Sequence, residues 1–207
     1  MAEEDVLELV DGPARAIGRR RALAVVAFAD SPDAAERQAA LHALGMVAPR
    51  RRSTQRLITR TLLAHLADPD EAPAVRGEAA EQLGCWWAGS GALRRAVVAN
   101  LLAGLYDAAP EVRFWCAYAL GTLRVRRAIP RLRELVGDPA AVDQLWSVGE
   151  EAVWAIMTIL HGSWPMPIEP EYVRLVELPP LARHELSARR GRAPAPRTGA
   201  SAAAADR

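Results

Sequence analysis

The side chains that could support catalysis or metal binding are few and scattered along the chain. The four histidines lie far apart, and the sequence has no His-Glu-x-x-His motif, no paired Cys-x-x-Cys motif and no glycine-rich phosphate loop after a strand. Because all 26 basic residues are arginine, Schiff-base chemistry and a phosphate-loop lysine are excluded. His42, Glu78 and Glu81 come closest to an acid–base or metal cluster. We therefore expect no catalytic residues, no metal and no cofactor.

Composition and cysteine usage narrow the class of protein. The two cysteines, Cys85 and Cys116, fall in segments with helical periodicity, which predicts packed, reduced and unreactive thiols. The chain has 207 residues, of which 51% are hydrophobic and 25% charged, and its formal net charge is +1. These values exclude a wholly disordered chain and give no strong field to attract nucleic acid. No apolar run approaches the roughly 18 residues of a membrane helix and the N-terminus begins acidic, so we expect a cytoplasmic protein that does not contact membranes.

The elements that would position these side chains are helices. Apolar residues recur at spacings of three and four up to about residue 160, and Asn-Gly or Asp-Gly hairpin turns are absent. The pattern predicts an all-α fold. Four helices, each followed by an acidic turn, are expected at Ala14–Ala29, Thr54–Ala67, Ala92–Tyr106 and Ala128–Val136.

A repeat with a period of 36 to 39 residues supplies a second helix to each unit. The segment from Val75-Arg76 to Leu83-Gly84 aligns with the segment from Val112-Arg113 to Leu120-Gly121, and weaker copies run over 37–45 and 148–157. One helical hairpin cannot bury its apolar face alone, so the hairpins must stack. We predict an α-solenoid of about four hairpins whose second helices line an inner wall, with Leu44, Leu83, Leu120 and Ile156 as the spine of its core.

The best-defined unit resembles the HEAT repeats, and more closely their short bilin-lyase-like subtype, the PBS lyase type. The resemblance rests on Val112-Arg113 through Leu120-Gly121, then Arg127-Ala128-Ile129-Pro130, Leu132, Leu135 and Asp138. It covers about residues 30–160. It implies a ladder between neighbouring units formed by a turn aspartate and an arginine six residues later, namely Asp70 with Arg76 and Asp107 with Arg113. The first unit departs from this spacing (Asp30 to Arg37), and the fourth has Gly149 in place of the arginine.

The residues of the second helices that point away from the apolar stripe predict the function. They make the inner wall aromatic and acidic, and exposed aromatic side chains on a concave face are typical of interaction sites. The glutamates suit an arginine- or lysine-bearing ligand. We predict a non-catalytic adaptor or scaffold that binds a protein or peptide, with a basic partner favoured. Burial of the rings by the C-terminal segment, or by a twist in the stack, is the alternative. The candidate partner-binding residues are His42, Glu78, Glu81, Phe114, Trp115, Tyr118, Glu150, Glu151 and Trp154.

Two other functions stay open. Arginines near the turns could form one edge that contacts phosphates, as in the solenoid DNA glycosylases, which are also built of HEAT-like repeats; this favours nucleic-acid binding, although the wall glutamates would repel a phosphate backbone. The bilin-lyase resemblance implies an enzyme or chaperone that handles a tetrapyrrole, yet no reactive group on the wall matches that chemistry. The candidate phosphate contacts are Arg50, Arg51, Arg52, Arg56, Arg126 and Arg127.

The two ends of the chain differ from the repeats in composition. We expect the solenoid to span 1–162, with a short amphipathic capping helix at 2–10. A proline-rich, extended segment with short helices is expected at 163–188, where it would cover the open end of the stack. The arginine-, alanine- and proline-rich tail at 189–207 is expected to be disordered.

Overall fold

The computed structural model describes residues 16–17, 19–49, 51–85, 91–142 and 146–162. All of them belong to one compact unit, Met1–Met166. The predicted capping helix at 2–10, the proline-rich segment at 163–188 and the tail at 189–207 lie outside the described residues.

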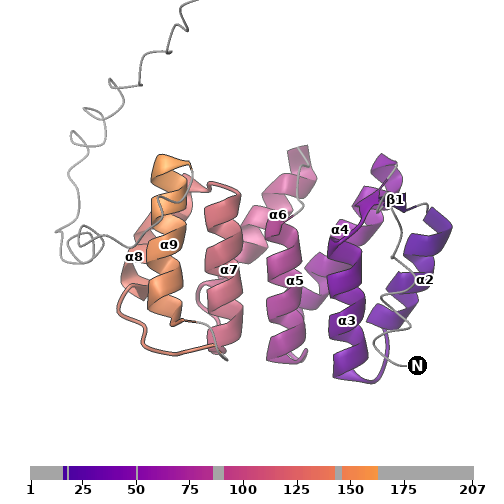
Figure 1. Ribbon diagram of the computed structural model, residues 1–207, viewed down its shortest axis with the longest axis horizontal. Helices are drawn as coiled ribbons and strands as arrows, with labels where there is room; N and C mark the ends of the chain where they lie inside the picture. Colours follow the sequence, from indigo (N-terminus) through magenta and orange to yellow (C-terminus); the bar gives the residue numbers. More distant parts are fainter. Residues whose placement is uncertain (1–15, 18, 50, 86–90, 143–145, 163–207) are drawn as a thin grey trace, which may run out of the picture. The chain divides into compact units, whose positions relative to one another are not determined.

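The described residues form four helical hairpins, as the repeat predicts (Figure 1). A single 3-10 turn, η1 (Arg126–Ala128), leads into the short helix of the fourth hairpin. The pairs are α2 (Arg19–Ala29) with α3 (Ala34–Gly45), α4 (Arg52–Ala67) with α5 (Pro73–Cys85), α6 (Gly91–Gly104) with α7 (Pro110–Thr122), and α8 (Ile129–Leu135) with α9 (Val148–His161).

The chain just before the first two hairpins departs from the helical prediction. A helix was expected to begin at Ala14, but Ala16–Ile17 form a strand, β1, that pairs in parallel with β2 (Ala48–Pro49). Because β1 and β2 precede α2 and α4, the pairing places the N-terminal ends of these two helices side by side.

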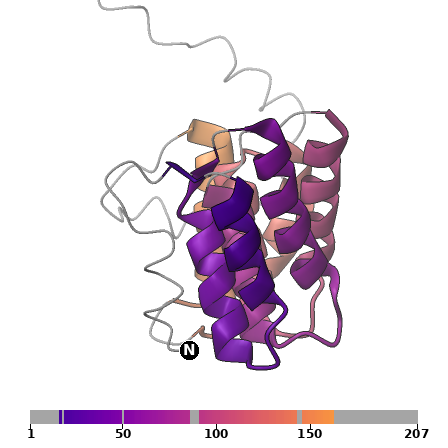
Figure 2. The same ribbon diagram turned by 90° about the vertical axis from the view of Figure 1, so that its right-hand side faces the viewer.

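The hairpins stack so that equivalent helices fall into two layers (Figures 1 and 2). In one layer α3 packs on α5, α5 on α7 and α7 on α9. In the other, α2 packs on α4 and α4 on α6. The predicted spine is confirmed, because Leu44, Leu83, Leu120 and Ile156 are all buried.

Small residues allow the second helices to approach closely. A Cβ atom built on Gly84 of α5 would lie 2.6 Å from Cα of Ala119 in α7, and one on Gly121 of α7 would lie 2.8 Å from Cα of Ala155 in α9. Both distances are shorter than side chains tolerate, so the backbones meet at these glycines. The glycines that end the second and third repeat motifs therefore set the spacing of α5, α7 and α9.

Candidate partner-binding face

A ladder of arginine–carboxylate pairs fixes how successive second helices are placed. Arg37 of α3 binds Glu71 with nitrogen–oxygen distances of 2.7 and 3.0 Å. Arg76 of α5 pairs with Asp107, and Nε of Arg113 in α7 lies 2.9 Å from Asp138. Each arginine thus reaches the turn of the next hairpin.

The arginines also stiffen their own turns. Arg37 donates to the carbonyl oxygens of Ser31 and Pro32 at 2.8 and 3.0 Å. Arg113 donates to those of Asp107 and Ala108 at 2.9 and 2.8 Å. One guanidinium therefore joins two turns, because its donors form a rigid fork.

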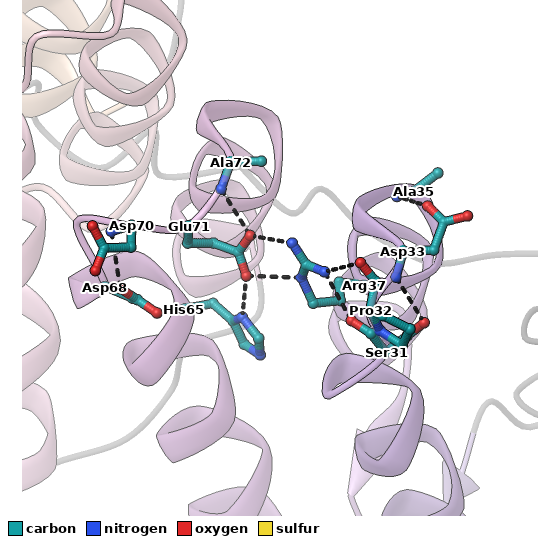
Figure 3. Close-up of polar contacts among 10 residues, drawn as sticks. All are labelled: Ser31, Pro32, Asp33, Ala35, Arg37, His65, Asp68, Asp70, Glu71 and Ala72. Carbon is teal, nitrogen blue, oxygen red and sulfur yellow. Dashed lines mark hydrogen bonds and ion pairs between the residues drawn. The ribbon is translucent and has the colours of Figure 1, made fainter.

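The ladder corrects two predictions at its start. Asp70 takes no part in it: it is exposed, and its backbone N–H donates to the carboxylate of Asp68 at 3.0 Å (Figure 3). Glu71 occupies the rung instead and accepts hydrogen bonds from Arg37 and from the backbone N–H of Ala72 (Figure 3). Arg37 takes part in the ladder although its spacing from Asp30 departs from the motif.

The environment of Glu71 determines its ionisation. Burial by itself raises the pKa of this carboxyl, but hydrogen bonds from Arg37 and His65 outweigh that effect and lower the pKa to about 2. The carboxyl group of Glu71 is therefore charged at neutral pH.

The ladder ends at the fourth hairpin for a steric reason. A side chain at Gly149 would collide with the carbonyl oxygen of Val136. The backbone N–H of Gly149 instead donates to the carbonyl oxygen of Asp138 at 2.9 Å. The turn that follows α8 packs directly on the start of α9, where the earlier units have an arginine.

The predicted cluster of His42, Glu78 and Glu81 joins α3 to α5. Nδ1 of His42 lies 3.0 Å from Oε1 of Glu78, and Nε2 of Gln82 donates to the same oxygen at 2.7 Å. Glu78 is only 8% exposed, so its predicted place on an open wall is wrong. Glu81 stays partly exposed, and burial together with the charge of Glu78 raises its pKa to about 7. Among the described residues no group of histidine, cysteine and carboxylate side chains is arranged to hold a metal ion.

The aromatic residues of α7 divide into one buried ring and two partly exposed rings. Phe114 is 2% exposed, so its predicted place on the surface is wrong. Its ring is covered by Trp115, at 5.1 Å between centroids, and by Trp146, at 6.3 Å. Trp115 and Tyr118 are half-buried and meet edge to face at 5.6 Å. These two rings keep the partial exposure that contact with a partner requires.

Trp146, in the loop before α9, is the residue that the sequence analysis missed. Its side chain is 42% exposed, and its ring lies parallel to that of Trp154 at a centroid distance of 6.4 Å. Trp146 lies outside the segments that the repeat alignment matches, so the alignment did not compare it with residues of the other units. Its place in the sequence could have indicated it, because Trp146 directly precedes Ser147, the residue that caps α9.

The two glutamates at the start of α9 have opposite environments. Glu150 is exposed and completes a capping box with Ser147, whose backbone and side-chain hydrogen bonds lower its pKa. Glu151 is 2% exposed, so its predicted place on the wall is wrong; it accepts a hydrogen bond from the indole of Trp146 at 2.9 Å. Burial raises the pKa of Glu151 to about 8.

The predicted phosphate contacts lie at the starts of first helices. Arg51, Arg52 and Arg56 are exposed at the start of α4, and Arg126 and Arg127 are exposed in η1. Arg50 lies outside the described residues.

The two cysteines differ in exposure. Cys116 is fully buried, as expected, and burial raises the pKa of its thiol. Cys85 is exposed, so the prediction that both thiols are packed is wrong for this residue; its Sγ lies 3.6 Å from the hydroxyl of Tyr118.

Comparisons with known proteins agree with this architecture. Residues 59–148 match the family model described as HEAT repeats. No curated protein matches the sequence. No helix among the described residues is both long and apolar enough to span a bilayer. The resemblance to HEAT repeats is confirmed over the matched residues, and the bilin-lyase-like subtype stays a prediction.

Similar solved structures include designed repeat proteins. An engineered protein is 23% identical over 76% of this chain and 71% of its own, with a TM-score of 0.49. A designed armadillo repeat protein in complex with the peptide (KR)4 is 18% identical over 91% of this chain and 81% of its own, with a TM-score of 0.48. Computationally designed armadillo repeat proteins for modular peptide recognition give 17% identity over 84% and 79%, with a TM-score of 0.46.

Proposed function

We propose that this chain, which contains HEAT repeats over residues 59–148, is a non-catalytic scaffold that binds another protein or peptide on the layer formed by α3, α5, α7 and α9. The observation that carries the proposal is the pair of parallel rings of Trp146 and Trp154, in which Trp146 is 42% exposed. We name the set Trp115, Tyr118, Trp146 and Trp154 the aromatic face.

The aromatic face is ordered before any partner arrives. Trp146 is held by its hydrogen bond to Glu151 and by Trp154, and Trp115 is held by Phe114 and Tyr118. Little side-chain freedom is then lost when a partner binds, and tryptophan and tyrosine supply a large contact area for each residue. Such rings are the residue types enriched among those that dominate binding energy.

The charges beside the aromatic face favour a basic partner. Glu150 is exposed and Glu81 is partly exposed, so both carboxyls can meet an arginine or lysine of the partner. The indole of Trp146 can accept the same cation on its ring. The buried Glu78 and Glu151 support the face from beneath and do not contact the partner. Because the pKa of Glu81 is about 7, its full charge develops as pH rises, and a cationic partner should bind more tightly at pH 8 than at pH 6.

The proposal can be tested with a random peptide library displayed on phage and selected against the full chain. Selected peptides should be rich in arginine and lysine, and Trp146→Ala should weaken the binding of individual peptides at least about tenfold. Tyr106→Ala is the matched control, because Tyr106 is the most exposed aromatic side chain described and lies in the turn just after α6, a helix of the other layer. If Trp146→Ala and Tyr118→Ala both leave the selected peptides bound as tightly as the wild type does, the proposal is wrong. Circular dichroism of each variant establishes that it is folded.

A further inference from the structure

A hollow of about 530 Å³ lies where α6 begins, next to η1, on the layer that does not carry the aromatic face. Four arginines line it: Arg94 and Arg95 of α6 with Arg126 and Arg127 of η1. Val98, Val125 and Gly91 are the other described residues of the lining, and none of the described lining residues is a carboxylate. The sequence analysis singled out Arg126 and Arg127 but not the two arginines of α6 that face the same hollow.

The four guanidinium groups lack counter-charges in the part of the chain that the structure describes. None of them takes part in an ion pair there, and the hydrogen bond that holds Arg94 runs to the carbonyl oxygen of Leu123 at 3.4 Å. Other arginines are paired: Arg76 and Arg113 bind aspartates, and Arg131 binds Glu134. The hollow therefore gathers positive charge that the protein itself leaves uncompensated.

The placement of these arginines also opposes the helix dipole. The first turns of α2, α4 and α6 contain no acidic residue, although each helix begins at or within a few residues of an arginine pair or triplet. By contrast, three of the four second helices, α3, α7 and α9, have a glutamate in the first turn, where a negative charge is favourable; α5 has none. Local rules of helix design are most often broken where a site needs the residue for another purpose.

We propose that this hollow binds a compact ligand with two or more adjacent phosphate groups. Each guanidinium presents a planar fork of donors that matches phosphate oxygens, and four of them converge from two hairpins on one volume. Adjacent phosphates concentrate enough negative charge in one place to engage all four. The buried side chains of Val98 and Val125 supply the apolar part of the lining.

The experiment is isothermal titration calorimetry of the full chain with inorganic tripolyphosphate and, separately, with inorganic monophosphate. We expect tripolyphosphate to bind with one site per chain, and monophosphate to bind at least tenfold more weakly. The double variant Arg126→Gln with Arg127→Gln should weaken tripolyphosphate binding at least about tenfold, because two charge-assisted contacts are lost. The double variant Arg51→Gln with Arg52→Gln is the control, since it removes the same charge from two residues of another hairpin that are also exposed.

Three results would overturn the proposal. The first is the absence of heat with tripolyphosphate. The second is an equal loss of affinity in both double variants, which would mean that the general charge of the edge attracts the anion. The third comes from a 20-nucleotide single-stranded DNA: if it binds more tightly than tripolyphosphate and the Arg51/Arg52 variant weakens it as much as the Arg126/Arg127 variant, the arginines serve an extended nucleic-acid backbone. All substituted side chains are exposed, so the variants should keep the fold.

Discussion

The indole N–H of Trp146 donates a hydrogen bond to the carboxyl group of Glu151 at 2.9 Å and so joins the loop before α9 to the first turn of that helix. The contact places one partly exposed ring over one buried acid. The same pair thus links the proposed aromatic face to the protonation of a buried carboxyl, because Glu151 is 2% exposed and its pKa is raised to about 8.

Replacing Glu151 by glutamine should remove a loss of stability that develops as pH rises from about 5 to 8. The pKa of the folded-state carboxyl lies above its ordinary value, so the folded protein keeps a proton that the unfolded chain releases. The stabilising contribution is complete below about pH 4.5 and is lost as pH rises toward 8. Glu151→Gln, which keeps an acceptor for Trp146, should therefore flatten the free energy of unfolding between pH 5 and 8 by roughly 2–4 kcal/mol.

Urea unfolding followed by circular dichroism at a series of pH values measures this effect. Glu134→Gln is a suitable control, since its exposed side chain should leave the slope of the wild type unchanged. A Glu151→Gln variant whose stability falls between pH 5 and 8 as steeply as that of the wild type contradicts the assignment.

The adjacent acids Asp70 and Glu71 should respond very differently to substitution. Glu71→Ala leaves Arg37 without its partner and exposes the turn to rearrangement, so we expect a loss of about 2–4 kcal/mol in the free energy of unfolding. Asp70→Ala should change it by less than about 0.5 kcal/mol, because Asp70 is exposed and outside the ladder.

The ladder also has a signature at low pH. The pKa of Glu71 is lowered to about 2, so its contribution to stability is complete above about pH 4.5 and disappears as pH falls toward 2. Denaturant titrations at pH 7 and pH 3 should show that the difference between the wild type and Glu71→Ala shrinks at the lower pH. If Asp70→Ala and Glu71→Ala lower the free energy of unfolding equally, the pairing of Arg37 with Glu71 does not stabilise the fold.

Gly84→Ala should destabilise the protein although alanine favours helices over glycine. The added Cβ would lie 2.6 Å from Cα of Ala119, so α5 and α7 must move apart, and we expect a net cost of about 1–3 kcal/mol. Gly137→Ala is the control, since a Cβ there meets no atom within 4 Å. Thermal unfolding distinguishes the two variants, and equal midpoints would mean that the layer tolerates a wider spacing.

The two thiols should react with iodoacetamide at very different rates. Cys116 is fully buried and its pKa is raised, so it should be labelled only after unfolding. Cys85 is exposed, although partial burial of the thiol also raises its pKa, and it should be labelled in the native protein at pH 9. Peptide mass spectrometry reports each site, and rapid native labelling of Cys116 would contradict the packing of α7.

The repeating pattern of the sequence was sufficient to predict the hairpins. Val112, Leu120 and their counterparts recur at helical spacing. Successive turns of a helix place such residues on the same face, so periodicity alone identifies the apolar stripe of each helix. The turn acids and the glycines of the repeat motif were recognisable because they recur at equivalent positions of the aligned copies. Strand β1 was missed because two residues are too few to show an alternation.

The contacts between hairpins were decided by the tertiary structure. Whether Arg37 meets Asp70 or Glu71, whether Phe114 is covered by Trp146, and whether Arg94 and Arg127 share a hollow all depend on how far one hairpin is rotated and shifted against the next. That displacement follows from the summed packing of many small side chains such as Gly84 and Ala119, and no spacing within a single helix encodes it. The sequence by itself determined the apolar stripe of each helix. The stacking of the helices determined which further side chains are buried, such as Phe114 and Glu151, and which side chains meet.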